Sequence, residues 1–250
     1  MSGHNKWSTI KHKKAAQDAK RSKIFSKIIK EITVAVKEGG TDEASNPRLR
    51  IALQNAKAAN MPKDNVLRAI NKADKENTDL QEMVFEGYAP HGIAVVVECL
   101  SDNKNRTVGA IRAIFTKRGG NLGTSGSVAF MFDRKSVFVV KKDNISDMDE
   151  FELEIIDAGA EDIEIDDEGK VIITAAKEDF GKLQKKLEEL NVEIESAQLE
   201  YIPKDRKELP VEQAKKVLQL IEDFEDNDDV QNVYHNLELT DELQSELEKE

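Results

Sequence analysis

The chain has 250 residues, enough for one large domain or two to three small ones, and its 39% hydrophobic and 34% charged residues are typical of a soluble globular protein. Its longest uninterrupted apolar run, Ile93 to Val97, is far too short to span a membrane, and residues 1–7 contain no apolar core of a signal peptide. The single cysteine, Cys99, excludes an intramolecular disulfide, so we expect a cytoplasmic protein with no membrane partner.

The net charge of −12 is distributed unevenly along the chain. Residues 1–75 carry 17 Lys and Arg against 7 Asp and Glu, whereas residues 141–250 carry 13 against 35. Such asymmetry is typical of a molecule that presents one face to a polyanion. The acidic half would repel nucleic acid, which leaves it free for a protein partner.

Residues 1–76 are predicted to form a basic helical domain that binds nucleic acid. A basic arm without apolar periodicity leads into a long helix, which begins near Ala15 and ends at Gly39-Gly40. Its apolar stripe and its lysines fall on opposite faces at about 100° per residue. The stripe contains Ile24, Phe25, Ile28, Ile29, Ile32 and Ala35, and the opposite face contains Lys20, Lys23, Lys27 and Lys30.

Two shorter helices complete this domain. Asn46-Pro47 is a helix cap followed by proline at the first helical position, and Leu49, Ala52, Leu53 and Ala56 supply the apolar face of the second helix. Pro62 starts a third helix, for which we predict that Val66, Leu67 and Ile70 point inward.

The pattern changes to strands in residues 80–135. Residues 84–88 and 93–100 are predicted to pair across a turn, and residues 107–118 form a helix that ends at a glycine pair. We predict another strand at residues 127–132. Phe130 and Phe132 share one face of it, as in an RNA-recognition sheet, but the consensus of that motif is absent, so we assign both rings to the core.

Residues 136–203 follow the order β-α-β-β-α-β of a ferredoxin-like unit. A later helix and a strand at residues 230–234 then return to complete the middle domain, and residues 240–250 form an acidic segment. The predicted fold is therefore α+β and multi-domain, with an N-terminal three-helix domain and two α/β (ferredoxin-like) domains, one inserted in the other. The domains span residues 1–76, residues 80–135 with 205–238, and the inserted residues 136–203.

The N-terminal basic cluster is the strongest candidate site. The first thirty residues hold nine Lys and Arg against Asp18 alone, and each phosphate contact releases counterions, so four or five contacts would dominate affinity. A solvated helix face is the alternative, although interspersed glutamates normally accompany one. The predicted nucleic-acid contacts are Lys6, Trp7, Lys11, Lys13, Lys14, Lys20, Arg21, Lys23, Lys27, Lys30, Arg48, Arg50 and Lys63.

Trp7 and a second group of basic residues each have two interpretations. Trp7 could stack on a base, or it could anchor the arm to the protein body, which we favour. A secondary basic group either extends the basic surface or forms a solvated helix face. It consists of Lys104, Arg106, Arg112, Lys117 and Arg118.

Signals for chemistry are weak. The glycine-rich residues 119–126 lack the Gly-Lys-Ser/Thr ending of a phosphate loop and lead into a strand, so a turn is the better interpretation. Asp226, Asp228 and Asp229 could hold Mg²⁺ in a nuclease, but helix-to-strand turns are often rich in Asp. His4 and His12 have no partner at metal-ligand spacing. We therefore predict no enzyme, no cofactor and no metal.

Several segments resemble the YebC family, from residue 3 to about residue 236. The residues that carry the resemblance are Gly3-His4-Asn5-Lys6-Trp7, Asn46-Pro47-Arg48-Leu49-Arg50, Asn60-Met61-Pro62-Lys63-Asp64-Asn65, Phe85-Glu86-Gly87-Tyr88-Ala89-Pro90, residues 97–107, residues 119–123 and residues 228–234. Asn5 stands where Ser is usual, and Ala89 and His91 stand where Gly is usual. The resemblance implies three domains and a regulator of gene expression.

The resemblance leaves the nucleic acid open, since bacterial members are labelled DNA-binding transcriptional regulators and mitochondrial relatives are translational activators. Our first hypothesis is a DNA-binding transcriptional regulator. The alternative is a ribosome-associated translation factor that binds structured RNA, and a metal-dependent nuclease is a remote third.

Overall fold

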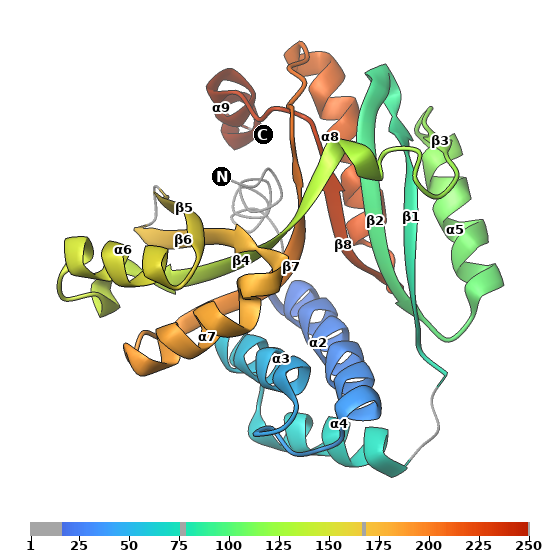
Figure 1. The fold of residues 1–250 in the computed structure, drawn as a ribbon. Coiled ribbons are helices and arrows are strands. Elements are labelled where there is room, and N and C mark those ends of the chain that lie inside the picture. The colour runs from blue at the N-terminus through green and yellow to red at the C-terminus, as the bar shows by residue number, and fades with distance from the viewer. Residues whose placement is uncertain (1–16, 76–78, 167–168, 250) are drawn as a thin grey trace. The chain divides into compact units, whose positions relative to one another are not determined.

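The computed structural model describes residues 17–75, 79–166 and 169–249. Helices and two four-stranded sheets make up these residues, which confirms the predicted α+β, multi-domain fold (Figure 1). They form two compact units. One, the ferredoxin-like unit, holds residues 28–75, 134–166 and 169–200 of the described chain, and the other, the split unit, holds residues 17–27, 79–133 and 201–249. The predicted division into three domains stays a prediction.

Three elements run from one unit into the other. They are helix α2 (Gln17–Gly39) and strands β4 (Phe132–Lys141) and β7 (Ile194–Pro203). The structure places no helix that is long and apolar enough to cross a membrane among the residues that it describes.

The sheet of the ferredoxin-like unit has the strand order of that fold. The order is β5 (Ala160–Ile165), β6 (Lys170–Ala176), β4 and β7. Helices α6 (Met148–Asp157) and α7 (Phe180–Glu189) are each inserted between two strands in the chain, so the predicted β-α-β-β-α-β unit is confirmed. Its core contains Phe138, Ile155, Ile173, Leu183 and Leu187, which are fully buried.

Helices α3 (Pro47–Ala58) and α4 (Lys63–Lys75) also belong to the ferredoxin-like unit. Ile51 of α3 packs against the hydrophobic core that the sheet of this unit forms with α6 and α7. In α4 the buried residues are Ala69 and Ala73, and Leu67 is 56% exposed, so the prediction that Leu67 points inward is wrong. The buried face of α4 consists of alanines. An alanine contributes less to an apolar pattern than a leucine does, so the pattern pointed to Leu67 instead.

Asn46 joins the end of α2 to the start of α3. Its Oδ1 accepts a hydrogen bond from the backbone N of Leu49 at 3.0 Å, which caps α3 as predicted. Its Nδ2 donates to the carbonyl oxygens of Ala35 and Gly40, at 2.7 and 2.8 Å. A methyl group on Gly39 would lie 2.7 Å from the Asn46 side chain, so this position requires glycine.

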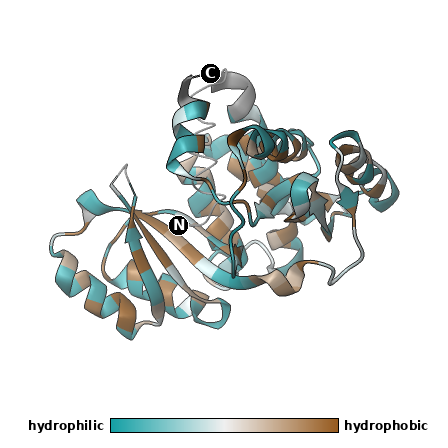
Figure 2. Cartoon of the chain, turned by 90° about the horizontal axis from the view of Figure 1, so that it is seen from above, coloured by the Kyte–Doolittle hydropathy of each residue, from teal (hydrophilic) through white to brown (hydrophobic). Residues whose placement is uncertain are grey.

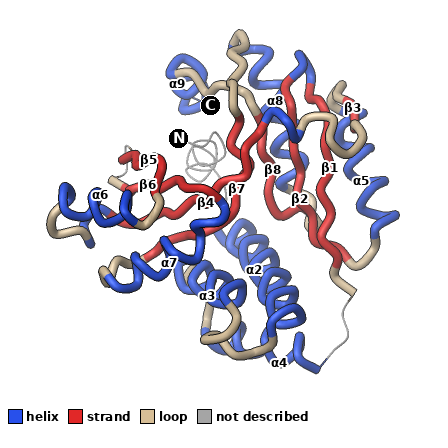
Figure 3. Tube along the Cα trace, in the orientation of Figure 1, coloured by secondary structure: helices blue, strands red, loops and turns tan. Residues whose placement is uncertain are grey.

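The split unit contains an antiparallel sheet whose last strand comes from the C-terminal part of the chain (Figure 3). The order is β3 (Asn121–Leu122), β1 (Gln81–Ala89), β2 (Ile93–Ser101) and β8 (Val230–His235). Helices α5 (Lys104–Lys117) and α8 (Val211–Glu225) bury their apolar residues against one face of it. Figure 2 shows hydrophobic residues along the strands and on one side of the helices.

Two predictions for the split unit are wrong. Residues 127–131 are not a strand, because Ala129–Met131 form a 3-10 turn and β4 begins only at Phe132. Phe132 is buried, but Phe130 is 66% exposed and is no core residue. The acidic segment at the C-terminus contains a helix, α9 (Asp241–Lys249), because Leu243 and Leu247 pack on the core of the split unit.

Candidate nucleic-acid interface

Part of the predicted interface lies outside the described residues. This holds for Lys6, Trp7, Lys11, Lys13 and Lys14, and also for His4 and His12. Lys20 lies in the first turns of α2, where the structure describes the backbone.

Two lysines of α2 contact the segment that runs from the end of α8 into β8, within the split unit. Lys23 Nζ lies 2.7 Å from Asp226 Oδ1, and Lys27 Nζ donates to the carbonyl oxygen of Gln231 at 3.0 Å. Both side chains are partly buried, so these two predicted nucleic-acid contacts already have partners within the protein. They fix the first half of α2 to the protein.

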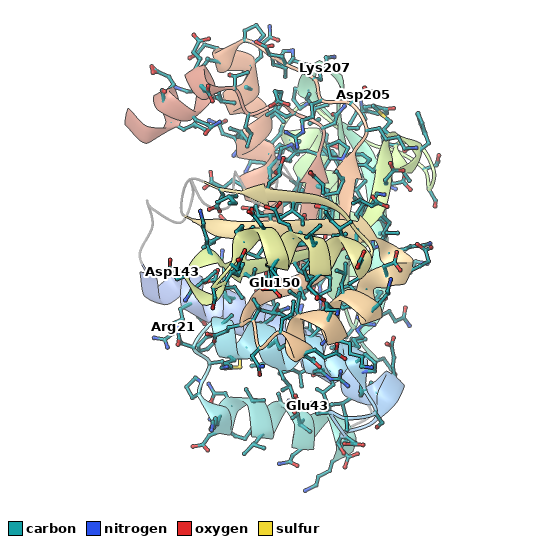
Figure 4. All side chains as sticks on the ribbon, turned by 60° about the vertical axis from the view of Figure 1, so that its left-hand side comes forward. Arg21, Glu43, Asp143, Glu150, Asp205 and Lys207 are labelled. Atoms are coloured by element: carbon teal, nitrogen blue, oxygen red, sulfur yellow. The ribbon has the colours of Figure 1, made fainter. Side chains whose placement is uncertain are left out.

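Arg21 is exposed on the first half of α2, where Figure 4 labels it. Its guanidinium carbon lies 5.3 Å from the ring centroid of Phe25, a cation–π distance. Ile24, predicted to belong to the apolar stripe, is 37% exposed. Further along α2, Lys30 is partly buried. The exposed end of α2 therefore presents an arginine beside apolar side chains.

The two arginines of α3 are held by acceptors of the ferredoxin-like unit. Arg48 lies 2.8 Å from Glu38 and 3.4 Å from Glu31. Arg50 donates to the carbonyl oxygen of Ala44 and lies 3.8 Å from Glu188 at the end of α7. These arginines connect helices and present less charge to solvent than the sequence indicated.

In contrast to the two arginines of α3, Lys63 is exposed at the first position of α4. Lys104 and Arg112 are exposed in the same way on α5. These three side chains keep the solvent access that a phosphate contact requires.

Arg106 is part of a polar cluster between α5 and β8. Its Nη2 lies 3.1 Å from Asp229 and 3.0 Å from Asp102, and these hydrogen bonds raise its pKa, Asp229 contributing most. Thr107 is fully buried and donates from Oγ1 to the same Asp229 carboxylate at 3.0 Å. The cluster anchors the start of α5 to the end strand of the sheet.

Arg118 and Lys117 both pair with Asp223 of α8. Arg118 makes two parallel contacts, Nε to Oδ2 at 2.8 Å and Nη2 to Oδ1 at 2.9 Å, and Lys117 Nζ adds a third at 3.2 Å. The Arg118 hydrogen bonds are the main reason why the pKa of Asp223 falls to about 2. The secondary basic group therefore has two parts. Arg106, Lys117 and Arg118 join α5 to Asp223 and Asp229, whereas Lys104 and Arg112 face solvent.

Backbone N–H groups in and directly after the glycine-rich segment bind a carboxylate that was not among the predicted site residues. Glu86 of β1 is 6% exposed and accepts hydrogen bonds from the backbone N–H groups of Gly126, Val128 and Ala129, at 2.7, 2.8 and 2.7 Å. Burial alone raises the pKa of Glu86, but the three donors outweigh it and the net pKa is lowered. Gly126 has a φ of +84°, which glycine adopts without strain. The signal in the sequence was a glutamate between Phe85 and Gly87, in a strand that lies near a loop without charged residues.

The three aspartates of the nuclease hypothesis do not converge on a metal site. Asp226 meets Lys23, and Asp229 is held by Arg106 and Thr107. The carboxylates of Asp226 and Asp229 are therefore already paired with Lys23 and Arg106. Among the described residues, no group of three or more His, Cys, Asp or Glu side chains has an arrangement that could hold a metal ion.

Comparisons with known proteins give a consistent picture. Residues 5–76 match the model of the TACO1/YebC protein N-terminal domain, and residues 80–237 match that of the TACO1/YebC second and third domain. A relative from Amoebophilus asiaticus is 54% identical over 95% of this chain and 98% of its own, and one from Kosmotoga olearia is 52% identical over 100% and 99%. Both carry the name "Probable transcriptional regulatory protein". The crystal structure of a conserved hypothetical protein from Aquifex aeolicus has a TM-score of 0.81 at 42% identity and covers 90% of this chain and 93% of its own.

Proposed function

Because the chain belongs to the TACO1/YebC family, it is a regulator of gene expression, and we propose that it acts by binding nucleic acid through its basic segment, residues 1–75. The observation that carries this proposal is the charge of that segment, 17 Lys and Arg against 7 Asp and Glu in a chain of net charge −12. Phosphate contacts by these residues supply affinity without regard to sequence. DNA is the first candidate, as the name of the relatives suggests, in a transcriptional regulator.

The described cations fall into two classes in this proposal. Lys23, Lys27, Arg48 and Arg50 hold α2 and α3 in place through the contacts described above. Exposed cations such as Arg21 and Lys63, together with the lysines before residue 17, contact phosphates. Exposed acidic residues of α8 and α9, such as Glu212, Asp241 and Glu242, form the surface for a protein partner.

A second candidate function is favoured by one observation, the exposed ring of Phe130. Sequence-specific RNA recognition stacks unpaired bases on aromatic side chains, whereas a duplex keeps its bases stacked inside. A ribosome-associated translation factor that contacts structured RNA therefore stays an alternative to the DNA-binding regulator.

A salt titration of affinity tests the proposal. The full chain should bind a DNA duplex or a structured RNA with an affinity that falls steeply with salt, by about 0.9 in logarithmic slope per DNA phosphate contacted. Replacing Lys11, Lys13, Lys14 and Lys20 by Ala should flatten that slope by about 0.9 for each phosphate that the variant no longer reaches. An unchanged slope would remove the basic segment from the interface.

The matched control removes four exposed lysines from other elements. These are Lys142, Lys177, Lys185 and Lys216, and their replacement by Ala changes the net charge equally. We expect this variant to keep the wild-type slope, because the lysines lie outside residues 1–75. Crosslinking in cells with ultraviolet light, followed by sequencing, then separates the two candidates: promoter DNA supports the transcriptional regulator, and ribosomal RNA supports the translation factor.

A further inference from the structure

Phe130 exposes its ring although the residues around it are well packed. Its side chain is 66% exposed, whereas Val128 is fully buried and Phe132 is 5% exposed. Full burial of a phenylalanine side chain is worth about 1.5–3 kcal/mol, so a ring left in water forgoes much of that gain. A single exposed apolar residue needs no special explanation by itself. The backbone around this one provides the second observation.

The turn that carries Phe130 is fixed on both sides. Glu86 clamps the backbone N–H groups of Gly126, Val128 and Ala129, and the carbonyl oxygen of Met131 accepts a hydrogen bond from the backbone N of Lys204 at 2.9 Å. The ring is therefore presented on a rigid support and is not exposed through fraying. A preorganised support lowers the entropy lost on binding a partner.

The segment that carries Phe130 contains no charged residue of its own, although Glu86 binds its backbone and the Asp133–Lys204 ion pair lies at its end. Residues 119–132 contain no Asp, Glu, Lys, Arg or His, in a chain in which 34% of residues are charged. The exposed polar residues of this segment are Asn121, Thr124 and Ser125, which offer amide and hydroxyl groups. A phosphate backbone would be met by cations, and a charged protein surface by opposite charges. A nucleobase is neutral, with a π-face for the ring and a polar edge for these groups.

We propose that the loop of residues 119–132 is a contact site for an unpaired nucleobase, with Phe130 as the stacking platform. The proposal rests on the proposed function, because the basic segment supplies the phosphate contacts and the loop adds a contact to a base. Glu86 acts as a positioning residue, since it holds the loop and does not reach the base. The site directs the protein to single-stranded or looped nucleic acid, where bases are free to stack.

An abasic oligonucleotide isolates the base contact from the phosphate contacts. The probe is an oligothymidylate of about 12 nucleotides, compared with a chain of equal length and charge that lacks bases. The wild-type chain should bind the intact probe roughly 5- to 150-fold more tightly than the abasic one. Phe130→Ala should remove this preference, and Phe130→Trp should retain it. Val84→Ala, which truncates another exposed residue of the split unit, should leave it unchanged.

Each alternative result has a definite meaning. Equal binding of both probes by the wild-type chain, or an unchanged preference in Phe130→Ala, overturns the base site and leaves the proposed function standing. Failure to bind either probe, a DNA duplex or structured RNA contradicts the proposed function itself, and this inference with it. Loss of a co-purifying protein in Phe130→Ala, alongside an unchanged preference for bases, would assign the loop to a protein partner.

Discussion

Arg118 and Asp223 form a two-point ion pair that joins α5 to α8, with contacts of 2.8 and 2.9 Å between the guanidinium and the carboxylate. Their side chains are 30% and 22% exposed. Parallel N–H···O contacts of this kind are stronger and more specific in geometry than a single lysine contact. The pair holds α5 on the helix that precedes the last strand of the sheet.

Asp223→Asn should lower the free energy of unfolding by about 1–2 kcal/mol at neutral pH, because Arg118 loses a charged partner. The pKa of Asp223 is about 2 in the folded chain, below its ordinary value of 3.8. Its contribution is therefore fully present above pH 3.8 and disappears as the pH falls towards 2. Urea unfolding over this range should show the difference between variant and wild type shrinking with acidity. Asp205→Asn, at an exposed carboxylate, serves as the control.

Glu86→Gln should loosen the loop that it clamps. The amide of Gln places an N–H₂ group against backbone N–H donors, which leaves at least one of three hydrogen bonds unmade and costs about 1–3 kcal/mol. Amide hydrogen exchange at Gly126, Val128 and Ala129 should accelerate. Glu82→Gln, on an exposed carboxylate of the same strand, should leave these rates unchanged.

The lowered pKa of Glu86 gives this clamp a pH dependence of known sign. A carboxylate whose pKa falls on folding stabilises the folded state above its ordinary pKa, and it loses that effect as acid protonates it. Exchange at the three amides should therefore accelerate in acid beyond the intrinsic trend in the wild-type chain. An equal pH trend in Glu86→Gln would contradict the role of the carboxylate.

Asp226→Ala should strengthen nucleic-acid binding. Lys23 Nζ lies 2.7 Å from this carboxylate, so its removal frees the lysine for a phosphate and steepens the salt slope by about 0.9. Asp228→Ala removes the same charge two residues away and should leave the slope as it is. A slope that Asp226→Ala does not change would show that Lys23 is purely structural.

Asn46→Ala should destabilise the ferredoxin-like unit by more than the loss of an ordinary helix cap. The substitution removes the acceptor for Leu49 and both donors to Ala35 and Gly40, for a total of about 2–4 kcal/mol. Asn46→Ser keeps a cap acceptor and loses the amide donors to Ala35 and Gly40. The difference between the two variants in urea unfolding therefore isolates the cap, and equal losses would mean that the cap contributes nothing.

Much of the fold could be predicted because its signals are local. The apolar stripe of Ile28, Ile32 and Ala35 and the cap at Asn46 depend on spacing within one helix, and the structure confirms both. Phe130 misled the prediction because an apolar run before β4 has the composition of a strand, whereas the clamp from Glu86 turns the backbone there. The helix α9 was missed because Leu243 and Leu247 are the only apolar residues in its acidic sequence.

The candidate site was less predictable because its ion pairs join distant parts of the chain. The charge of residues 1–75 was evident, but the partners of Lys23, Arg106 and Arg118 lie more than 100 residues later. Nothing in local spacing indicates which lysines are held by the protein and which face solvent. Only folding brings the acidic tail to these cations.

The separation of 203 residues between Lys23 and Asp226 also orders events during synthesis. At about 5–20 residues per second, the ribosome makes the acceptor roughly 10–40 s after the lysine. Throughout that interval the nascent basic helix carries its charge without the carboxylate that later balances it. Any polyanion near the exit of the ribosome therefore competes for Lys23 before the chain's own tail has been translated.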